Sequence, residues 1–87
     1  MKTKVTATIN TSIKNNFIEG NLYIAQNNNS SNKYERIILC TKSNSELIGI
    51  EIYHISNGLD KTRLGFKGDW VSENFNLFSG EIKIVQD

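Results

Sequence analysis

The side chains that could perform nucleophilic or acid–base chemistry are few in this sequence. It contains one histidine, His54, and one cysteine, Cys40. Nucleophilic catalysis needs a base within hydrogen-bond reach of an activated nucleophile. Cys40 lies inside an apolar run instead of at a helix N-terminus that would stabilise a thiolate, so a reactive Cys40–His54 pair is not expected. We therefore predict no catalytic residues and a protein that is not an enzyme.

Metal-binding patterns are also missing from the sequence. A structural zinc site needs four Cys or His ligands, and the chain has two such residues. No D-x-D-x-D-G calcium loop is present. We interpret the dispersed carboxylates as solvated surface charges: Glu46, Glu51, Asp60, Asp69 and Glu73. We expect no metal and no cofactor. A carboxylate-based hydrolase would be favoured only if a cleft brought two of these acids together.

Cations and aromatic residues alternate in one stretch of the second half of the chain. This candidate binding cluster consists of Lys61, Arg63, Phe66, Lys67 and Trp70. Such interleaving is typical of surfaces that bind single-stranded nucleic acid, and Arg and Trp also dominate protein-interface hot spots. Asp60 and Asp69 offset part of the local charge. The other interpretation is structural, because the only tryptophan of a small domain is often its core anchor.

Two further features have structural explanations. His54 follows Ile48, Ile50 and Ile52 in the same alternation, which predicts a partly buried histidine at the rim of a strand. Residues 65–68 match the GxxG loop of KH domains, but that loop joins two helices. Strand patterns flank it here, so a tight bend explains these glycines better.

Length, composition and charge define the scaffold that must position these residues. At 87 residues, residues 1–87 are expected to form a single β domain. A domain of this size buries only about 60–65% of its unfolded surface, so a homo-oligomer is an open alternative. The 38% hydrophobic and 22% charged residues exclude wholesale disorder. The net charge of +1 supplies no overall field for nucleic acid or a membrane.

Membrane and secretion signals are not found in the sequence. No stretch approaches the roughly 20 apolar residues of a membrane span, and the N-terminal residues lack the apolar core of a signal peptide. A single cysteine cannot form an intramolecular disulfide. We expect a cytoplasmic protein without a membrane partner.

Alternation of apolar and polar residues with a period of two is the dominant pattern. It predicts half-buried strands over residues 5–13, 17–25, 47–55 and 81–85. The apolar run 37–40 predicts a central strand over 34–41 that is covered on both faces. Lysines at positions 2, 4 and 14 indicate that the first strand is an exposed edge.

Turn signals separate these strands. Residues 26–32 and 42–45 are polar connections. Asn57-Gly58 is the preferred pair for a type I′ turn and predicts a hairpin into residues 59–66. Gly20 indicates a bend or bulge, and Gly80 a turn before the last strand.

One helical turn precedes that last strand. Phe75 and Phe78 stand three residues apart behind Ser72, a plausible N-cap. The whole pattern predicts an all-β fold, a small antiparallel SH3-like barrel of five to six strands with one short helical turn before the last strand. An OB-fold would carry a longer helix between its third and fourth strands, and none fits.

Four short motifs form one pattern across roughly the second half of the chain. It consists of Leu39-Cys40-Thr41, Gly68-Asp69-Trp70, Phe75 and Phe78-Ser79-Gly80-Glu81-Ile82. This pattern resembles that of small uncharacterised β-barrel proteins encoded by phages and prophages. Because it is built from aromatic core residues and a turn glycine, the resemblance implies a fold and no activity.

Two binding functions follow from these observations. The first is a non-enzymatic protein-binding module, encoded by a phage or mobile element, that inhibits a host protein such as a defence factor by occupying its surface. The second is a binder of nucleotides or single-stranded nucleic acid, including an oligomer that sequesters a small signalling nucleotide. A host protein is thus the first expected partner, and a nucleotide or nucleic acid is the alternative.

Overall fold

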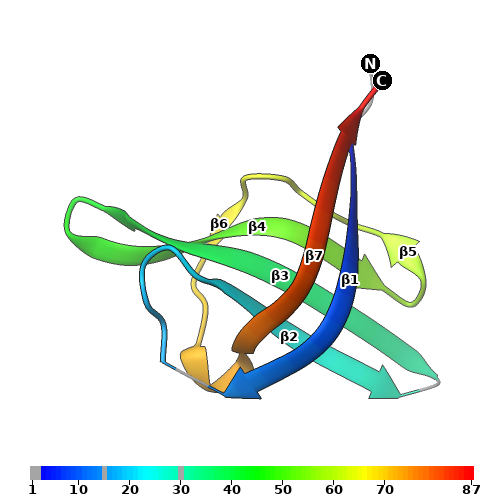
Figure 1. The fold of residues 1–87 in the computed structure, drawn as a ribbon, viewed down its shortest axis with the longest axis horizontal. Coiled ribbons are helices and arrows are strands. Elements are labelled where there is room, and N and C mark those ends of the chain that lie inside the picture. The colour runs from blue at the N-terminus through cyan, green and yellow to red at the C-terminus, as the bar shows by residue number, and fades with distance from the viewer. Residues whose placement is uncertain (1–2, 15, 30) are drawn as a thin grey trace.

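The structure is a computed structural model that describes residues 3–14, 16–29 and 31–87. Its described part contains seven strands and one 3₁₀ helix (Figure 1). They are β1 (Thr3–Lys14), β2 (Leu22–Asn29), β3 (Asn32–Ser43), β4 (Glu46–Ser56), β5 (Leu59–Asp60), β6 (Lys67–Gly68), η1 (Ser72–Asn74) and β7 (Asn76–Gln86). Within these residues no helix has the length and apolarity needed to cross a membrane.

All strand pairs are antiparallel and belong to one curled sheet. Its order is β1-β7-β2-β3-β4-β5, with β6 beside β4. The long strands β1 and β7 bend together across β2, β3 and β4, and the sheet forms a half-barrel (Figure 1). The predicted all-β antiparallel fold with one helical turn before the last strand is confirmed, with seven strands instead of five or six. β1 lies at the edge of the sheet, as its lysines predict.

The core has two parts because both faces of β3 are covered. Ile37 and Ile38 are adjacent and fully buried, and they point to opposite faces. One cluster of buried residues is Val5, Ile24, Ile37 and Tyr53. The other is Tyr23, Ile38, Cys40 and Phe75. The prediction of a central strand buried on both sides is therefore confirmed.

The turn predicted at Asn57-Gly58 forms, and the predicted connection over 42–45 shortens to Asn44 and Ser45 because β3 continues to Ser43. Asn57 and Gly58 have φ angles of 54° and 78°, as a type I′ turn requires. Asn44 and Ser45 also have positive φ angles, of 53° and 69°, between β3 and β4.

The predicted strand over 17–25 and the predicted connection over 26–32 are partly wrong. β2 begins only at Leu22, after a turn in which Gly20 has a φ of 93°. The strand then continues through the asparagine run to Asn29, which pairs with Asn32. Polar residues can extend an exposed hairpin because the backbone ladder needs no apolar side chain.

The second half of the chain differs more from the prediction. Only Leu59–Asp60 forms a strand after the Asn57-Gly58 turn, and residues 61–66 form a loop. Gly80 lies inside β7, where a Cβ would collide with the carbonyl oxygen of Thr8. Ser72 is the first residue of η1 instead of its N-cap, and no side chain caps this turn.

Candidate functional site

A β-bulge in β4 determines which side chains reach the site. Ile37 pairs with Tyr53 and Ile38 pairs with Glu51, so Ile52 has no partner on β3. The extra residue reverses the alternation of the strand. As a result, Glu51 and His54 lie on the same face. The prediction that His54 shares the face of Ile52 is wrong, because Ile52 packs against the core cluster on the other face.

Glu51 is fully buried, so its interpretation as a solvated charge is wrong. Its Oε1 lies 2.9 Å from Arg36 Nε and 3.5 Å from Arg63 Nη2. The Arg36 N–H is not aligned for a hydrogen bond, so that contact is an ion pair. The backbone amide of Arg63 donates a 2.7 Å hydrogen bond to Oε2. The other four carboxylates for which the sequence predicted exposure are exposed: Glu46, Asp60, Asp69 and Glu73.

Backbone hydrogen bonds attach the loop 61–66 to β4 beside this carboxylate. The Glu51 amide donates to the Phe66 carbonyl at 2.8 Å, and the Gly65 amide donates to the Glu51 carbonyl at 2.9 Å. Gly65 has a φ of 88°, which an L side chain rarely adopts. The backbone amide of His54 donates a 2.8 Å hydrogen bond to Thr62 Oγ1. The loop is thus held at both of its ends.

The two arginines that pair with Glu51 also contact three aromatic rings. We call Tyr34, Arg36, Arg63, Phe66 and Trp70 the arginine–aromatic cluster. The Arg36 guanidinium carbon lies 5.4 Å from the ring centroid of Tyr34 and 5.0 Å from that of Trp70. The corresponding distance from Arg63 to Phe66 is 3.6 Å, and Phe66 and Trp70 meet edge to face at 6.3 Å. Cation–π contacts of this kind attract a guanidinium group to the face of a ring.

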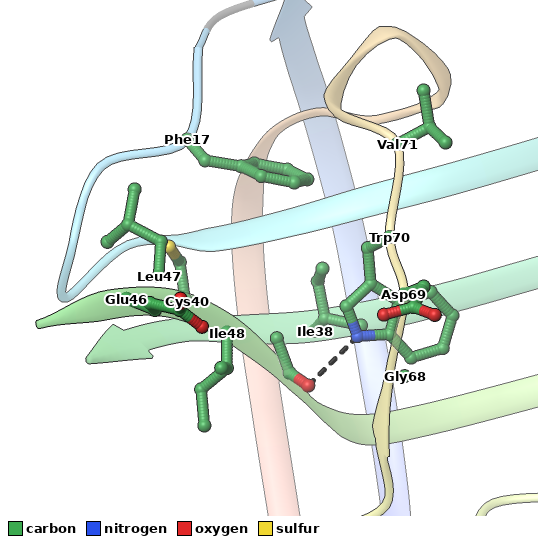
Figure 2. Close-up of a pocket in the computed structure, with 11 residues that line it drawn as sticks. Phe17, Ile38, Cys40, Glu46, Leu47, Ile48, Gly68, Asp69, Trp70 and Val71 are labelled. Atoms are coloured by element: carbon green, nitrogen blue, oxygen red, sulfur yellow. Dashed lines mark hydrogen bonds between the residues drawn. The ribbon is translucent and has the colours of Figure 1, made fainter. Parts of the chain in front are cut away.

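Trp70 is half-buried and belongs both to the core and to the surface. Its indole Nε1 donates a 2.9 Å hydrogen bond to the Gly49 carbonyl (Figure 2). The ring covers Gly49 so closely that a Cβ there would collide with it. On its other side Trp70 packs against Phe75 of the second core cluster.

The structure brings together three of the five residues of the candidate binding cluster, Arg63, Phe66 and Trp70. Lys61 and Lys67 are exposed on the same segment. Sequence reasoning missed Tyr34, Arg36 and Glu51, which β3 and β4 contribute. A usable signal was present, because Arg36 and Glu51 interrupt apolar strands where a charge must find a partner.

His54 is buried more deeply than predicted, at 8% exposure. Arg36 Nη2 lies 3.1 Å from its Nδ1, and the Tyr34 ring meets it edge to face. Burial lowers the pKa of His54, the positive charge of Arg36 lowers it further, and Glu51 opposes both. A neutral imidazole that accepts a hydrogen bond from Arg36 explains this environment.

Cys40 is remote from His54 along the same face. The strand register places Cys40 opposite Gly49 and His54 opposite Arg36. Four residues of β3 separate these positions, which corresponds to about 13 Å. Burial raises the pKa of the Cys40 thiol, and the charge of Glu19 adds to this effect. No three His, Cys, Asp or Glu side chains of the described chain gather as a metal site would require.

A pocket of about 290 Å³ is lined in part by Trp70 and by none of residues 61–66. Figure 2 shows Phe17 reaching toward it from the loop before β2, and Trp70 from the segment between β6 and η1. Glu46 and Asp69 line it as well. The Cys40 side chain comes from β3.

No protein-family model, curated protein or solved structure matches this chain. The chemistry of the site therefore rests on its own geometry: a surface of arginines and aromatic rings over a buried carboxylate, next to a pocket.

Proposed function

We propose that this protein is a non-enzymatic module that binds another protein through the arginine–aromatic cluster. The supporting observation is the buried Glu51 carboxylate, which holds Arg63 in place through its backbone amide. Arg63 and Phe66 are thereby presented to solvent on an ordered loop, with 52% of the Arg63 side chain and 39% of Phe66 exposed. Ordering these groups before binding lowers the entropic cost of association.

The residue types favour a protein partner. Arg, Tyr and Trp are enriched at the energetic centres of protein interfaces. The resemblance of the second half of the chain to small phage and prophage proteins favours a host protein, such as a defence factor, in a cytoplasmic setting. The module would act as an inhibitor by covering the surface of that protein.

A phosphate ligand fits the charges less well. Glu51 pairs with both Arg36 and Arg63, so its negative charge offsets part of the positive charge that would attract a phosphate. Asp60 and Asp69 lie exposed on the segment that carries Lys61 and Lys67. A nucleotide or single-stranded nucleic acid remains the alternative ligand, and its binding would weaken steeply with salt.

Affinity capture from a bacterial lysate tests the proposal. Immobilised wild-type protein is expected to retain a stoichiometric partner that the double variant Arg63→Ala, Phe66→Ala does not retain. Leu59→Ala is the matched control, because Leu59 is also exposed, at 63%, but lies on β5. Absence of any stoichiometric partner contradicts the proposal, as does equal capture by wild type and double variant. Salt-sensitive binding of an oligonucleotide would favour the alternative.

A further inference from the structure

Aromatic rings in mutual contact frame the pocket beside Trp70. Phe17 and Trp70 each pack edge to face against Phe75, with ring centroids 5.8 Å and 5.9 Å apart. Ile38 and Cys40, both buried, line the pocket from β3. The core therefore supplies one wall of the pocket.

Among the described residues that line the pocket, the charged ones are both acidic. They are the exposed carboxylates Glu46 and Asp69. Neither carboxylate forms an ion pair with another described residue. Aromatic rings attract cations, and carboxylates form charge-assisted hydrogen bonds with them. The described lining is therefore complementary to a cationic group on an aliphatic stem.

A free stretch of strand edge runs along the same pocket. β6 pairs with β4 only at Gly49 and Ile50, and in the described chain no strand lies beside residues 46–48 on that side. The amide and carbonyl of Glu51 face the β6 side. Because backbone groups alternate along a strand, the amide and carbonyl of Leu47 face the β6 side as well. An extended segment can add to such an edge and place alternate side chains into an adjacent pocket.

We propose that this pocket binds a lysine or arginine side chain of an extended partner segment that pairs with the free edge of β4 at residues 46–48. The inference rests on the proposed protein-binding function and names the partner's chemistry. Apolar parts of the same segment contact Leu47 and Val71, which are 46% and 55% exposed at the pocket. The partner's basic segment and the arginine–aromatic cluster would then lie on either side of Trp70.

A titration with short blocked peptides tests the pocket directly. The probe is a pentapeptide with lysine at its centre and valine and threonine around it. Peptides with norleucine or glutamate at the centre serve as comparisons. Binding is followed through the indole N–H signal of Trp70, the only tryptophan. The lysine peptide is expected to bind about tenfold more tightly than the norleucine peptide at low ionic strength, and the glutamate peptide more weakly still.

Charge-removing variants identify the residues responsible. The double variant Glu46→Gln, Asp69→Asn is expected to lower the affinity for the lysine peptide about tenfold, to the norleucine level. Glu73→Gln is the matched control, because Glu73 is exposed on η1 and does not line the pocket. Circular dichroism checks that each variant folds.

Equal affinity for the lysine and norleucine peptides, or no binding of either, overturns the pocket assignment. So does a double variant that binds the lysine peptide as the wild type does. The proposed function is decided separately by affinity capture. If the Glu46→Gln, Asp69→Asn protein still captures the partner fully while the Arg63→Ala, Phe66→Ala protein does not, the binding function stands and the pocket has no part in it.

Discussion

The carboxylate of Glu51 and the backbone amide of Arg63 are joined by a 2.7 Å hydrogen bond, across twelve residues of sequence. This bond links the buried face of β4 to the loop that carries Phe66. A hydrogen bond to a carboxylate is about twice as strong as one between neutral groups. The buried charge is therefore the anchor of the candidate binding surface.

Replacing Glu51 by glutamine removes that charge and leaves Arg36 and Arg63 without their partner. Breaking a buried ion pair from one side costs about 3–5 kcal/mol. We expect a loss of this size in the free energy of unfolding measured with urea. The control, Glu73→Gln, should change it by no more than about 0.5 kcal/mol. A loss below about 1 kcal/mol for Glu51→Gln would contradict the role of Glu51 as an anchor.

Gly49 leaves the space that the Trp70 indole occupies. A methyl group at this position would collide with the Trp70 ring and with Ile38. Gly49→Ala is expected to cost about 1–3 kcal/mol of stability and to shift the tryptophan emission to the red as the ring moves into water. In a Trp70→Ala background the cost of the added methyl group should fall by at least about 0.5 kcal/mol. An unchanged cost would show that the two residues do not compete for space.

The environment of His54 makes stability depend on pH. Its folded-state pKa lies below the ordinary value of 6.5 because of burial and then Arg36, with smaller contributions from Arg63 and Lys61 and opposition from Glu51. Between the two pKa values the unfolded state binds more protons than the folded state, so stability falls as the pH drops below 6.5. His54→Gln should remove this part of the dependence in urea unfolding. An equal slope in the variant would exclude His54 as its source.

Tyr53 produces the opposite dependence at high pH. Burial, and then the charge of Glu35, raise the pKa of Tyr53 to about 12, from 10.0. Between these values the unfolded chain has lost a proton that the folded chain retains, so stability falls as the pH rises above 10 by at most about 3 kcal/mol. Tyr53→Phe should lose stability less steeply over this range. If the free energy of unfolding falls equally steeply with pH in the wild type and in Tyr53→Phe, the assignment to Tyr53 is refuted.

Local patterns predicted the parts of the fold that local interactions determine. The Asn57-Gly58 pair forms its turn because few other residues adopt positive φ angles easily. The apolar run 37–40 lies in a strand buried on both faces because the chain has enough apolar surface to cover both. Predicting these features does not require knowing which strands pair with one another.

The bulge at Ile52 could not be predicted in this way. Alternation alone continues through residues 48–54, but the extra residue changes the side on which His54 emerges. Its position is set by the partner strand, β3, and by the loop that Glu51 holds. The same contacts explain why residues 61–66 leave the sheet after two residues of β5.

The candidate site was predictable only as far as it lies on one segment. Arg63, Phe66 and Trp70 are close in sequence and meet in the structure. Arg36 joins them from β3, because antiparallel pairing places it opposite His54. The register between neighbouring strands determines which charged residues meet. Alternation within one strand does not specify that register.

The most direct test of the central claim is a hydrogen-exchange footprint of the protein in complex with the partner that it captures. If the arginine–aromatic cluster is the binding surface, amides of residues 62–71 gain protection on binding, and those of β1 and β7 change little. Protection confined to β1 and β7, with residues 62–71 exchanging as in the free protein, would contradict it.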